Sequence, residues 1–484
     1  MRLIFPVLAL SVISISIVSC KSKSKTGSQK ADVLAVNLDT TVSPGEDFFQ
    51  YANGGWINKN PIPAEQSAWG IGNLVIEENL KRLREISEKA AESNAAKGSP
   101  EQKIGDFWTM AMDSAKIEAD GVKPLQPWLD KVNAISDVKS LVSTVADLKK
   151  IGSSTLFSDF VTQDDKNSDV MTYKLWQGGI GLPEREYYFK NDSTTNNIRN
   201  KYVEYITGML TMAGEDAGTA NTAAKNILAL ETKLAQASRK LEDLRDPYTN
   251  YNKMAIADLG KMNAEIDWSN YLRSSGVKSI DSVIVGQPDF FKALDNVLKT
   301  VPISDWKSYV KFNLISDFAA ALPDKFGLAA FDFNKLFSGA KVRRPRWKRS
   351  IQSSENVMGE MMGQLYVKEF FNEKAKKRYE DMVEAIREAL KDRIITLSWM
   401  SDSTKQKAYV KLAAMKRKVG YPEKWKDFST MEIGRESNFQ NMASANTWWH
   451  NYQMNKLGKP VDRDEWDMFP QTYNAYYNSS NNEI

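Results

Sequence analysis

The sequence is short of the two residue types that carry most metal and thiol chemistry. Among its 484 residues there is one histidine, His450, and one cysteine, Cys20. A catalytic zinc site needs several converging ligands and usually includes histidine, so this scarcity argues against a zinc site within the chain. It also excludes a serine or cysteine nucleophile activated by histidine at any position other than His450. His450 lies in an aromatic helical stretch, 446–452, where we expect it to pack or cap rather than bind metal.

The sequence also lacks a strong charge of either sign and a phosphate-binding loop. Its 65 basic and 61 acidic residues give a formal net charge of +4, so nothing favours nucleic acid as a partner. Residues 177–181 are glycine-rich, but they lack the lysine and hydroxyl residue of a P-loop and the third glycine of a dinucleotide fingerprint. The acidic cluster at 462–467 is typical of a solvated turn, and its spacing alone assigns no carboxylate pair to catalysis.

Neither the apolar deficit of a disordered protein nor the composition of a membrane protein is present. Hydrophobic residues make up 42% of the chain and charged residues 26%, as in ordinary globular proteins. A single compact core is not expected at this length, so we predict two lobes or a large helical array.

The N-terminus has the pattern of a secretion signal. Arg2 precedes an apolar run, 3–18, that is as long as a signal-peptide core and short for a membrane span. The run closes on Ile17-Val18-Ser19-Cys20, which resembles the bacterial lipobox. We therefore predict a lipoprotein signal peptide over 1–20 with Cys20 acylated, the alternative being an uncleaved signal anchor. A polar stretch then predicts a flexible tether over 21–40. Lysine directly after the cysteine favours a lipid anchor in the outer membrane of a bacterial cell envelope, facing the periplasm or the outside.

Helical periodicity dominates the rest of the chain, so we predict a mostly α fold. Apolar residues recur at spacings of three and four in 76–90, 227–244, 379–400 and 408–419. We expect all four stripes to pack in a core. The last helix should begin at a capping box formed by Ser403 and Gln406. Strand signals are few. One candidate is 283–285, which could equally be a connector between two helices, and the other is 472–477.

Several strings in the sequence resemble one family. They are DFFQYANGGW at 47–56, GIGLPEREYY at 179–188, RWKR at 346–349, GQLYV at 363–367, GYP at 420–422, KPVDRDEW at 459–466 and NAYY at 474–477. In this order they are similar to motifs of the zinc metallopeptidases related to neprilysin, endothelin-converting enzyme and bacterial endopeptidase O.

The resemblance implies a two-lobed ectopeptidase in which a large helical lobe caps a thermolysin-like catalytic lobe. It implies a peptidase N-terminal helical domain over 41–440 and the start of the catalytic domain over 441–484. Asn474 and Ala475 match the family's substrate-binding residues, which hold the main chain of an oligopeptide. An asparagine amide both donates and accepts hydrogen bonds, and a strand edge pairs with an extended peptide of any sequence, which suits that role.

The sequence departs from the family pattern in two ways. The family's zinc helix, His-Glu-x-x-His, follows the substrate strand, and this sequence ends before such a motif, so no catalytic or metal-binding residue is assigned. Ala68 and Ile76 stand where mammalian members carry arginines for the substrate's C-terminal side. We therefore expect the N-terminal part of a membrane-anchored zinc metalloendopeptidase that is inactive by itself. The alternative is a non-catalytic lipoprotein that binds a peptide or a partner.

Overall fold

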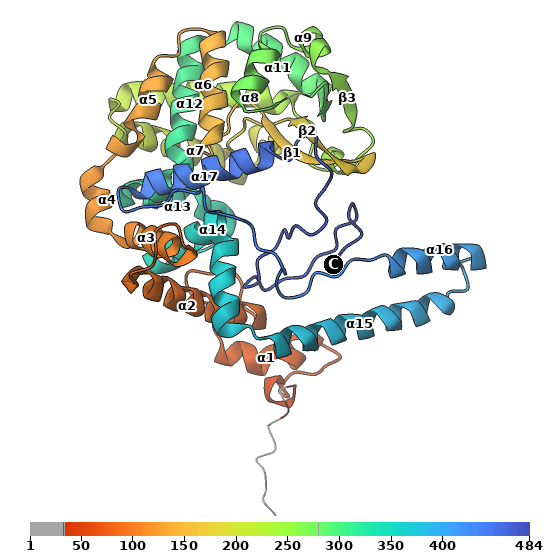
Figure 1. Ribbon diagram of the computed structural model, residues 1–484. Helices are drawn as coiled ribbons and strands as arrows, with labels where there is room; N and C mark the ends of the chain where they lie inside the picture. The colour runs from red at the N-terminus through yellow and green to blue at the C-terminus, as the bar shows by residue number, and fades with distance from the viewer. Residues whose placement is uncertain (1–31, 33, 279) are drawn as a thin grey trace, which may run out of the picture. The chain divides into compact units, whose positions relative to one another are not determined.

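The computed structural model describes residues 32, 34–278 and 280–484 (Figure 1). The predicted signal peptide, Cys20 and most of the predicted tether lie outside the described residues. The described chain divides into two units, the first ending at Ile62 and the second running from Pro63 to Ile484.

The first unit is a short helical segment built around the Gly54-Gly55 pair. Its α1 (Phe48–Lys59) begins at Asp47, whose carboxylate accepts a hydrogen bond of 2.9 Å from the main-chain N–H of Gln50. A Cβ atom on Gly55 would lie only 2.7 Å from the carbonyl oxygen of Leu38. The pair of glycines in the 47–56 motif therefore lets the preceding segment lie directly against α1.

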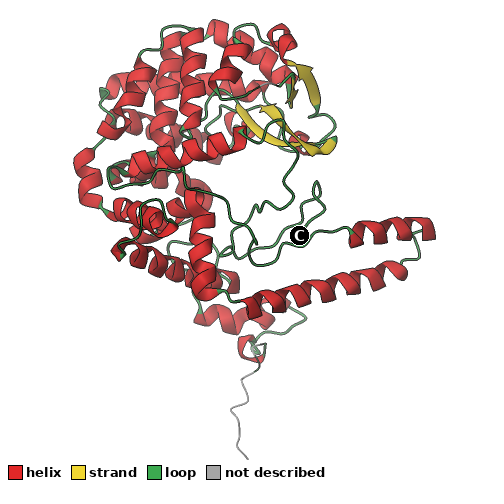
Figure 2. Cartoon of the chain, in the orientation of Figure 1, coloured by secondary structure: helices red, strands yellow, loops and turns green. Residues whose placement is uncertain are grey.

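The second unit is mainly helical, which confirms the predicted mostly α fold (Figure 2). None of the described helices is both long and apolar enough to span a membrane. The helices of this unit are α2 (Ile71–Glu92), α3 (Pro100–Met112), α4 (Ser114–Asp120), α5 (Gln126–Asn133), α6 (Val138–Lys150), α7 (Ser193–Met212), α8 (Ala217–Ala237), α9 (Leu259–Met262), α10 (Trp268–Ser274), α11 (Pro288–Thr300), α12 (Ile303–Asp317), α13 (Asp324–Ser338), α14 (Arg346–Phe370), α15 (Glu373–Ile395), α16 (Asp402–Ala413) and α17 (Asn438–Met454).

One small sheet interrupts the helices, in the strand order β1-β2-β4-β3. β1 (Ser158–Asp164) and β2 (Asn167–Trp176) form an antiparallel hairpin, β4 (Ser282–Val285) runs parallel to β2, and β3 (Asn252–Ala255) is antiparallel to β4. The candidate strand at 283–285 is thus confirmed, whereas the β1–β2 hairpin was not predicted. The hairpin lacks the alternation by which a strand is predicted, because Asp159, Asp164 and Lys174 are buried in it while Phe160 is exposed.

Two apolar clusters form the core of the second unit, and α17 contributes to both. The larger one gathers α5 to α13 and the sheet, and Phe439 and Ala443 of α17 belong to it. The smaller one joins α2, α3 and α14 and includes Ala445, with Trp449 packed against it. The indole N–H of Trp449 also donates a 2.8 Å hydrogen bond to the carbonyl of Val357 in α14. The predicted domain boundary between residues 440 and 441 falls inside this helix.

Several predicted helix ends differ from the structure. α15 ends at Ile395 and α16 at Ala413, before the stripes predicted over 379–400 and 408–419 do. α16 is capped by Ser401, which accepts a hydrogen bond from the N–H of Thr404, so the predicted capping box of Ser403 and Gln406 is wrong. Serine is a good cap at either position, and only the course of the preceding turn selects Ser401. α8 ends at Ala237, before the predicted stripe does, and Leu241 beyond it is exposed.

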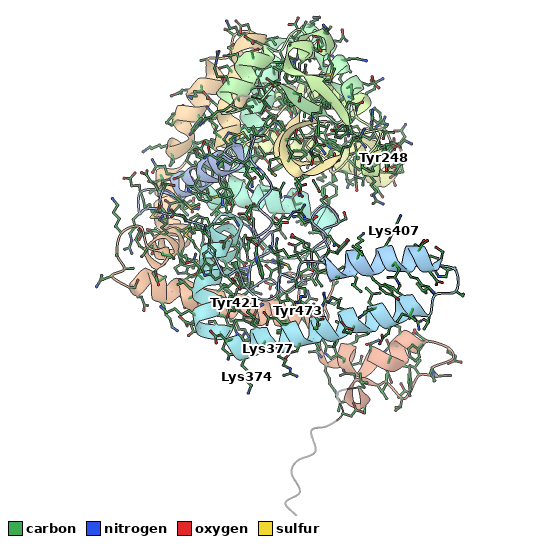
Figure 3. All side chains as sticks on the ribbon, turned by 45° about the vertical axis from the view of Figure 1, so that its right-hand side comes forward. Tyr248, Lys374, Lys377, Lys407, Tyr421 and Tyr473 are labelled. Carbon is green, nitrogen blue, oxygen red and sulfur yellow. The ribbon has the colours of Figure 1, made fainter. Side chains whose placement is uncertain are left out.

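The stripe predicted for 379–400 forms a helix but not a core. α15 and α16 run side by side as an arm, with Lys374 and Lys377 of α15 and Lys407 of α16 exposed on it (Figures 1 and 3). The apolar face of α15 is also exposed, and the side chain of Ile386 is 61% accessible. Periodicity predicts that a helix has an apolar face, but it does not predict whether another described element covers that face. The exposed members of the stripe are Tyr379, Met382, Ile386 and Leu390.

Candidate functional site

The candidate peptide-binding residues Asn474 and Ala475 lie in an exposed segment without regular secondary structure that follows Phe469. Residues 472–477 do not form the predicted strand, because no described strand lies beside them to complete a ladder. The Asn474 carboxamide oxygen accepts a 2.8 Å hydrogen bond from the N–H of Ala475. The carbonyl of Ala475 and both main-chain groups of Tyr476 have no hydrogen-bond partner among the described residues. An extended peptide could therefore pair with this segment.

The segment is held at its N-terminal end by Gln471, which is hydrogen-bonded to residues of both α2 and α14. The Gln471 side-chain N–H donates to Oε1 of Glu355 at 3.1 Å and to the carbonyl of Gly359 at 3.0 Å. Asn79 of α2 donates to the Gln471 carbonyl at 2.9 Å, and Tyr366 of α14 donates to the Asn79 oxygen at 3.0 Å. Gln471 is only 4% exposed, and these bonds satisfy its side-chain N–H group and its main-chain carbonyl, whereas its Oε1 has no hydrogen-bond partner among the described residues.

Two glycines of α14 let the segment lie against that helix. A Cβ atom on Gly359 would overlap the ring of Phe469, and one on Gly363 would lie 2.7 Å from the ring of Pro470. α14 is also kinked at Met358, the residue before Gly359. The close packing of Phe469 and Pro470 on α14 therefore depends on the absence of side chains at both glycines.

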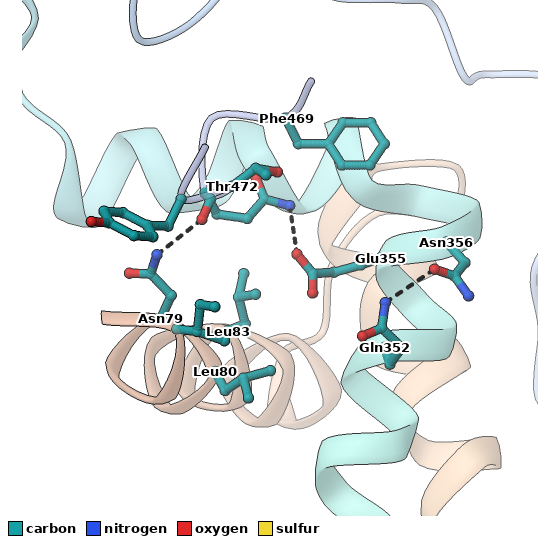
Figure 4. Close-up of a pocket in the computed structure, with 11 residues that line it drawn as sticks. Asn79, Leu80, Leu83, Gln352, Glu355, Asn356, Phe469 and Thr472 are labelled. Atoms are coloured by element: carbon teal, nitrogen blue, oxygen red, sulfur yellow. Dashed lines mark hydrogen bonds between the residues drawn. The ribbon is translucent and has the colours of Figure 1, made fainter. Parts of the chain in front are cut away.

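A cavity of about 510 Å³ opens where α2, α14 and the segment meet (Figure 4). Its walls combine apolar and amide side chains, and Glu355 supplies the single charge among the described lining residues. The volume is in the range of small-ligand sites. The lining residues are Ile76, Asn79, Leu80, Leu83, Gln352, Glu355, Asn356, Phe469, Gln471, Thr472 and Tyr473.

A second hollow lies on the other side of the segment. It has a volume of about 610 Å³, and Asn474 and Tyr476 line it together with Phe469 and Thr472, which also line the first cavity. The two hollows therefore flank one stretch of main chain.

Burial perturbs Glu355, the charged residue of the first cavity. It raises the pKa of the Glu355 carboxyl, and the hydrogen bond from Gln471 opposes this shift without cancelling it. No basic side chain of the described residues pairs with this carboxylate. An ionised Glu355 thus lacks the positive partner that buried carboxylates usually have.

The end of the chain is fastened beside 416–418. The N–H of Lys416 donates to the carbonyl of Asn482 at 2.9 Å, and Lys418 and Ile484 continue the pairing. Beside these main-chain hydrogen bonds, the Lys418 ammonium lies 2.7 Å from the Glu483 carboxylate. Residues on both sides of the candidate segment are therefore anchored, while the segment itself is exposed.

The described residues do not fit a zinc ion. They contain no group of three or more His, Cys, Asp or Glu side chains that could hold a metal. Nε2 of His450 is 2.8 Å from the carbonyl oxygen of Ser275, so the imidazole ties α17 to the end of α10, and burial lowers its pKa.

Comparison with known proteins places this helical scaffold in a family. Residues 44–422 match the family model of the peptidase family M13, and the match covers well over half of the chain. The chain belongs to peptidase family M13. This confirms the resemblance drawn from the motifs between 47 and 477.

The M13 relatives are longer than this chain. Neprilysin-3 of Drosophila melanogaster is 28% identical, with the match covering 93% of this chain and 60% of that protein. Endothelin-converting enzyme 1 of Rattus norvegicus is 27% identical, with 93% and 61% covered. The chain thus spans about 60% of the length of these curated relatives.

Solved structures show the same fold. The crystal structure of the Mycobacterium tuberculosis zinc metalloprotease ZMP1 in complex with an inhibitor has a TM-score of 0.87 at 32% identity, covering 93% of this chain and 68% of that one. PepO of Lactobacillus rhamnosis, at 19% identity, shares the fold with a TM-score of 0.83, covering 91% of this chain and 70% of that one.

Sequence motifs predicted only part of this candidate site. NAYY pointed to Asn474 and Ala475, but nothing in the sequence singled out Glu355, Gln471 or Asn79. The paired glycines Gly359 and Gly363 were a usable signal, because small residues four apart on one helix face indicate a close approach.

Proposed function

We propose that this chain provides the peptide-binding part of a zinc metalloendopeptidase that hydrolyses oligopeptides. Membership of family M13 and similarity to endothelin-converting enzyme 1 and to the zinc metalloprotease ZMP1 support the class of reaction. The observation that carries the proposal for this chain is the exposed segment at Asn474 and Ala475, where the carbonyl of Ala475 and both main-chain groups of Tyr476 are open beside two hollows. An extended peptide pairs there through its main chain, so the contact tolerates different side chains.

Replacing Asn474 by alanine is expected to weaken binding of an extended oligopeptide about tenfold or more. The change removes an amide that donates and accepts, and each hydrogen bond contributes about 1 kcal/mol. Fluorescence anisotropy of a labelled peptide with the 484-residue chain measures the effect.

The matched control for this substitution is Asn191→Ala. Asn191 is also exposed, and its side chain makes no hydrogen bond to another described residue. The control should bind like the native chain. Equal affinity of the Asn474 variant, or no binding by the native chain, contradicts the proposal.

We also propose that the ligands of the zinc ion and the side chain that activates water belong to residues other than those described here. The purified chain should then contain no stoichiometric zinc and should not cleave a fluorogenic peptide. Elemental analysis and the cleavage assay test this, and cleavage that a chelator abolishes contradicts it. Peptide binding without cleavage is equally what a non-catalytic binding lipoprotein would show, so an added source of zinc ligands is needed to separate the two.

We propose that the protein is anchored to the outer membrane of a bacterial cell envelope through acylated Cys20. The lipobox-like sequence at 17–20 supports this. Mass spectrometry of the N-terminal peptide tests it, and a free Cys20 thiol in the mature protein contradicts it.

A further inference from the structure

We propose that the cavity between α2, α14 and Phe469–Tyr473 receives a cationic side chain, lysine or arginine, of the bound peptide, with Glu355 as its counter-charge. The inference rests on the proposed function, because the peptide must lie along the segment that carries Asn474. It concerns the choice among peptides, which neither the family nor the motifs assign.

The negative charge in the cavity favours a ligand group with a positive charge. Glu355 is the only charged residue among the described residues of the lining, and its Oε1 accepts a hydrogen bond from Gln471 at 3.1 Å. No described donor bonds its other oxygen, Oε2. Figure 4 shows the Glu355 carboxylate directed from α14 into the space beside α2. A cation there would supply the missing partner and offset the cost of burying the carboxylate.

The neighbouring basic side chains do not compete for Glu355. On α2, Arg82 lies 3.5 Å from Glu78 and also donates to the Tyr366 hydroxyl at 3.2 Å. On α14, Lys348 is bonded to Glu77 at 2.7 Å. Because these cations have partners of their own, the cavity keeps its negative charge.

The walls suit a side chain with an alkyl stem and a charged end. Leu80 and Leu83 form an apolar wall and are buried from solvent, whereas Ile76 is partly exposed. Phe469 and Tyr473 add aromatic faces, and aromatic faces attract cations. Lysine and arginine bury their stems on such surfaces while the charged end keeps polar partners.

The position of the cavity places it within reach of a bound peptide. Tyr473 lines this cavity, and the next residue, Asn474, lines the second hollow. Successive residues of an extended chain are about 3.3 Å apart, so a peptide paired at Asn474 has a side chain close to the cavity mouth.

The test compares two labelled peptides that differ at one position, arginine in one and citrulline in the other, with that position scanned along the peptide. Citrulline keeps the shape of arginine without its charge. At one position the native chain should bind the arginine peptide about tenfold more tightly by anisotropy. The variant Glu355→Gln should lose this preference and bind the citrulline peptide as the native chain does. The amide retains an acceptor for Gln471, so the segment should stay in place.

A matched control and a small probe separate the possible failures. Glu369→Gln changes an acid of α14 that pairs with Lys89 at 2.9 Å outside the cavity, and this variant should keep the preference. Agmatine, an arginine side chain without a peptide, should bind the native chain and not Glu355→Gln, as measured by ligand-observed NMR. If neither peptide binds, the proposed function fails and agmatine alone decides the inference. Binding of agmatine that is unchanged in Glu355→Gln, or absent from the native chain, overturns it, as does peptide binding without an arginine preference.

Discussion

In the variant Lys418→Met, the free energy that holds residues 478–484 against 416–418 is expected to fall by about 3–5 kcal/mol. The variant leaves the Glu483 carboxylate buried without a counter-charge. In the native chain Lys418 is 4% exposed and Glu483 is 1% exposed at the side chain, with 2.7 Å between the charged atoms. The Glu483 oxygens accept no aligned hydrogen bond from a described residue, so the contact is mainly one of charge. Lys418 is thus the main compensation for a buried negative charge.

Hydrogen exchange at the N–H groups of Lys416 and Ile484, together with denaturant unfolding, measures this loss. Lys416→Met is the matched control, because Lys416 pairs with Asp464, whose side chain is 87% exposed, and such surface pairs contribute only about 0–1 kcal/mol. The double variant Lys418→Met with Glu483→Met removes both charges and should recover most of the loss. Equal effects of the two single variants would show that burial of Glu483 is not what matters.

As the pH rises from 4 to 8, the free energy of unfolding of the variant Glu231→Gln is expected to increase by about 3 kcal/mol relative to that of the native chain. Glu231 is fully buried and accepts hydrogen bonds from the hydroxyls of Tyr188 at 2.7 Å and Tyr202 at 2.9 Å. Burial nevertheless raises the pKa of its carboxyl from 4.5 to about 7. The folded state therefore holds the proton more tightly than the unfolded state does. The stability that this proton contributes is fully present below pH 4.5 and is lost as the pH rises through about 7.

Urea unfolding of both proteins at several pH values measures this difference, since glutamine does not titrate. Glu204→Gln is the control, because the Glu204 side chain is 64% exposed and pairs only with Lys201. The difference in free energy of unfolding between Glu204→Gln and the native chain should not change with pH. A Glu231 difference that is also constant between pH 4 and 8 would show that the carboxyl is not perturbed in the folded state.

The Glu231 site also shows why the GIGLPEREYY motif needs its glycines. The N–H of Gly181 donates to Glu231 at 3.2 Å, and a Cβ atom on Gly181 would overlap the Tyr202 hydroxyl. Gly179 adopts a positive φ of 77°, which other residues rarely take. The motif marked the family in the sequence, whereas its physical role became visible only when α7 and α8 were placed around it.

Local patterns predicted elements well where one residue type decides the conformation. Apolar spacing located α2 and the buried residues Leu83 and Ile86, and three β-branched residues located β4. The same reasoning was wrong about the exposed stripe of α15 and about a strand at 472–477. Both errors concern partners: an apolar face or an extended segment becomes core or sheet only if another element meets it.

The sequence by itself determined the family and the helical class and predicted the two residues of the candidate segment, since motifs and periodicity are carried by residues close together in the chain. Only the tertiary structure decided that Glu355 and Gln471 share a cavity and that Lys418 neutralises Glu483. These contacts join residues from distant parts of the chain. Burial and charge at such places depend on how helices pack, and no local pattern encodes that packing.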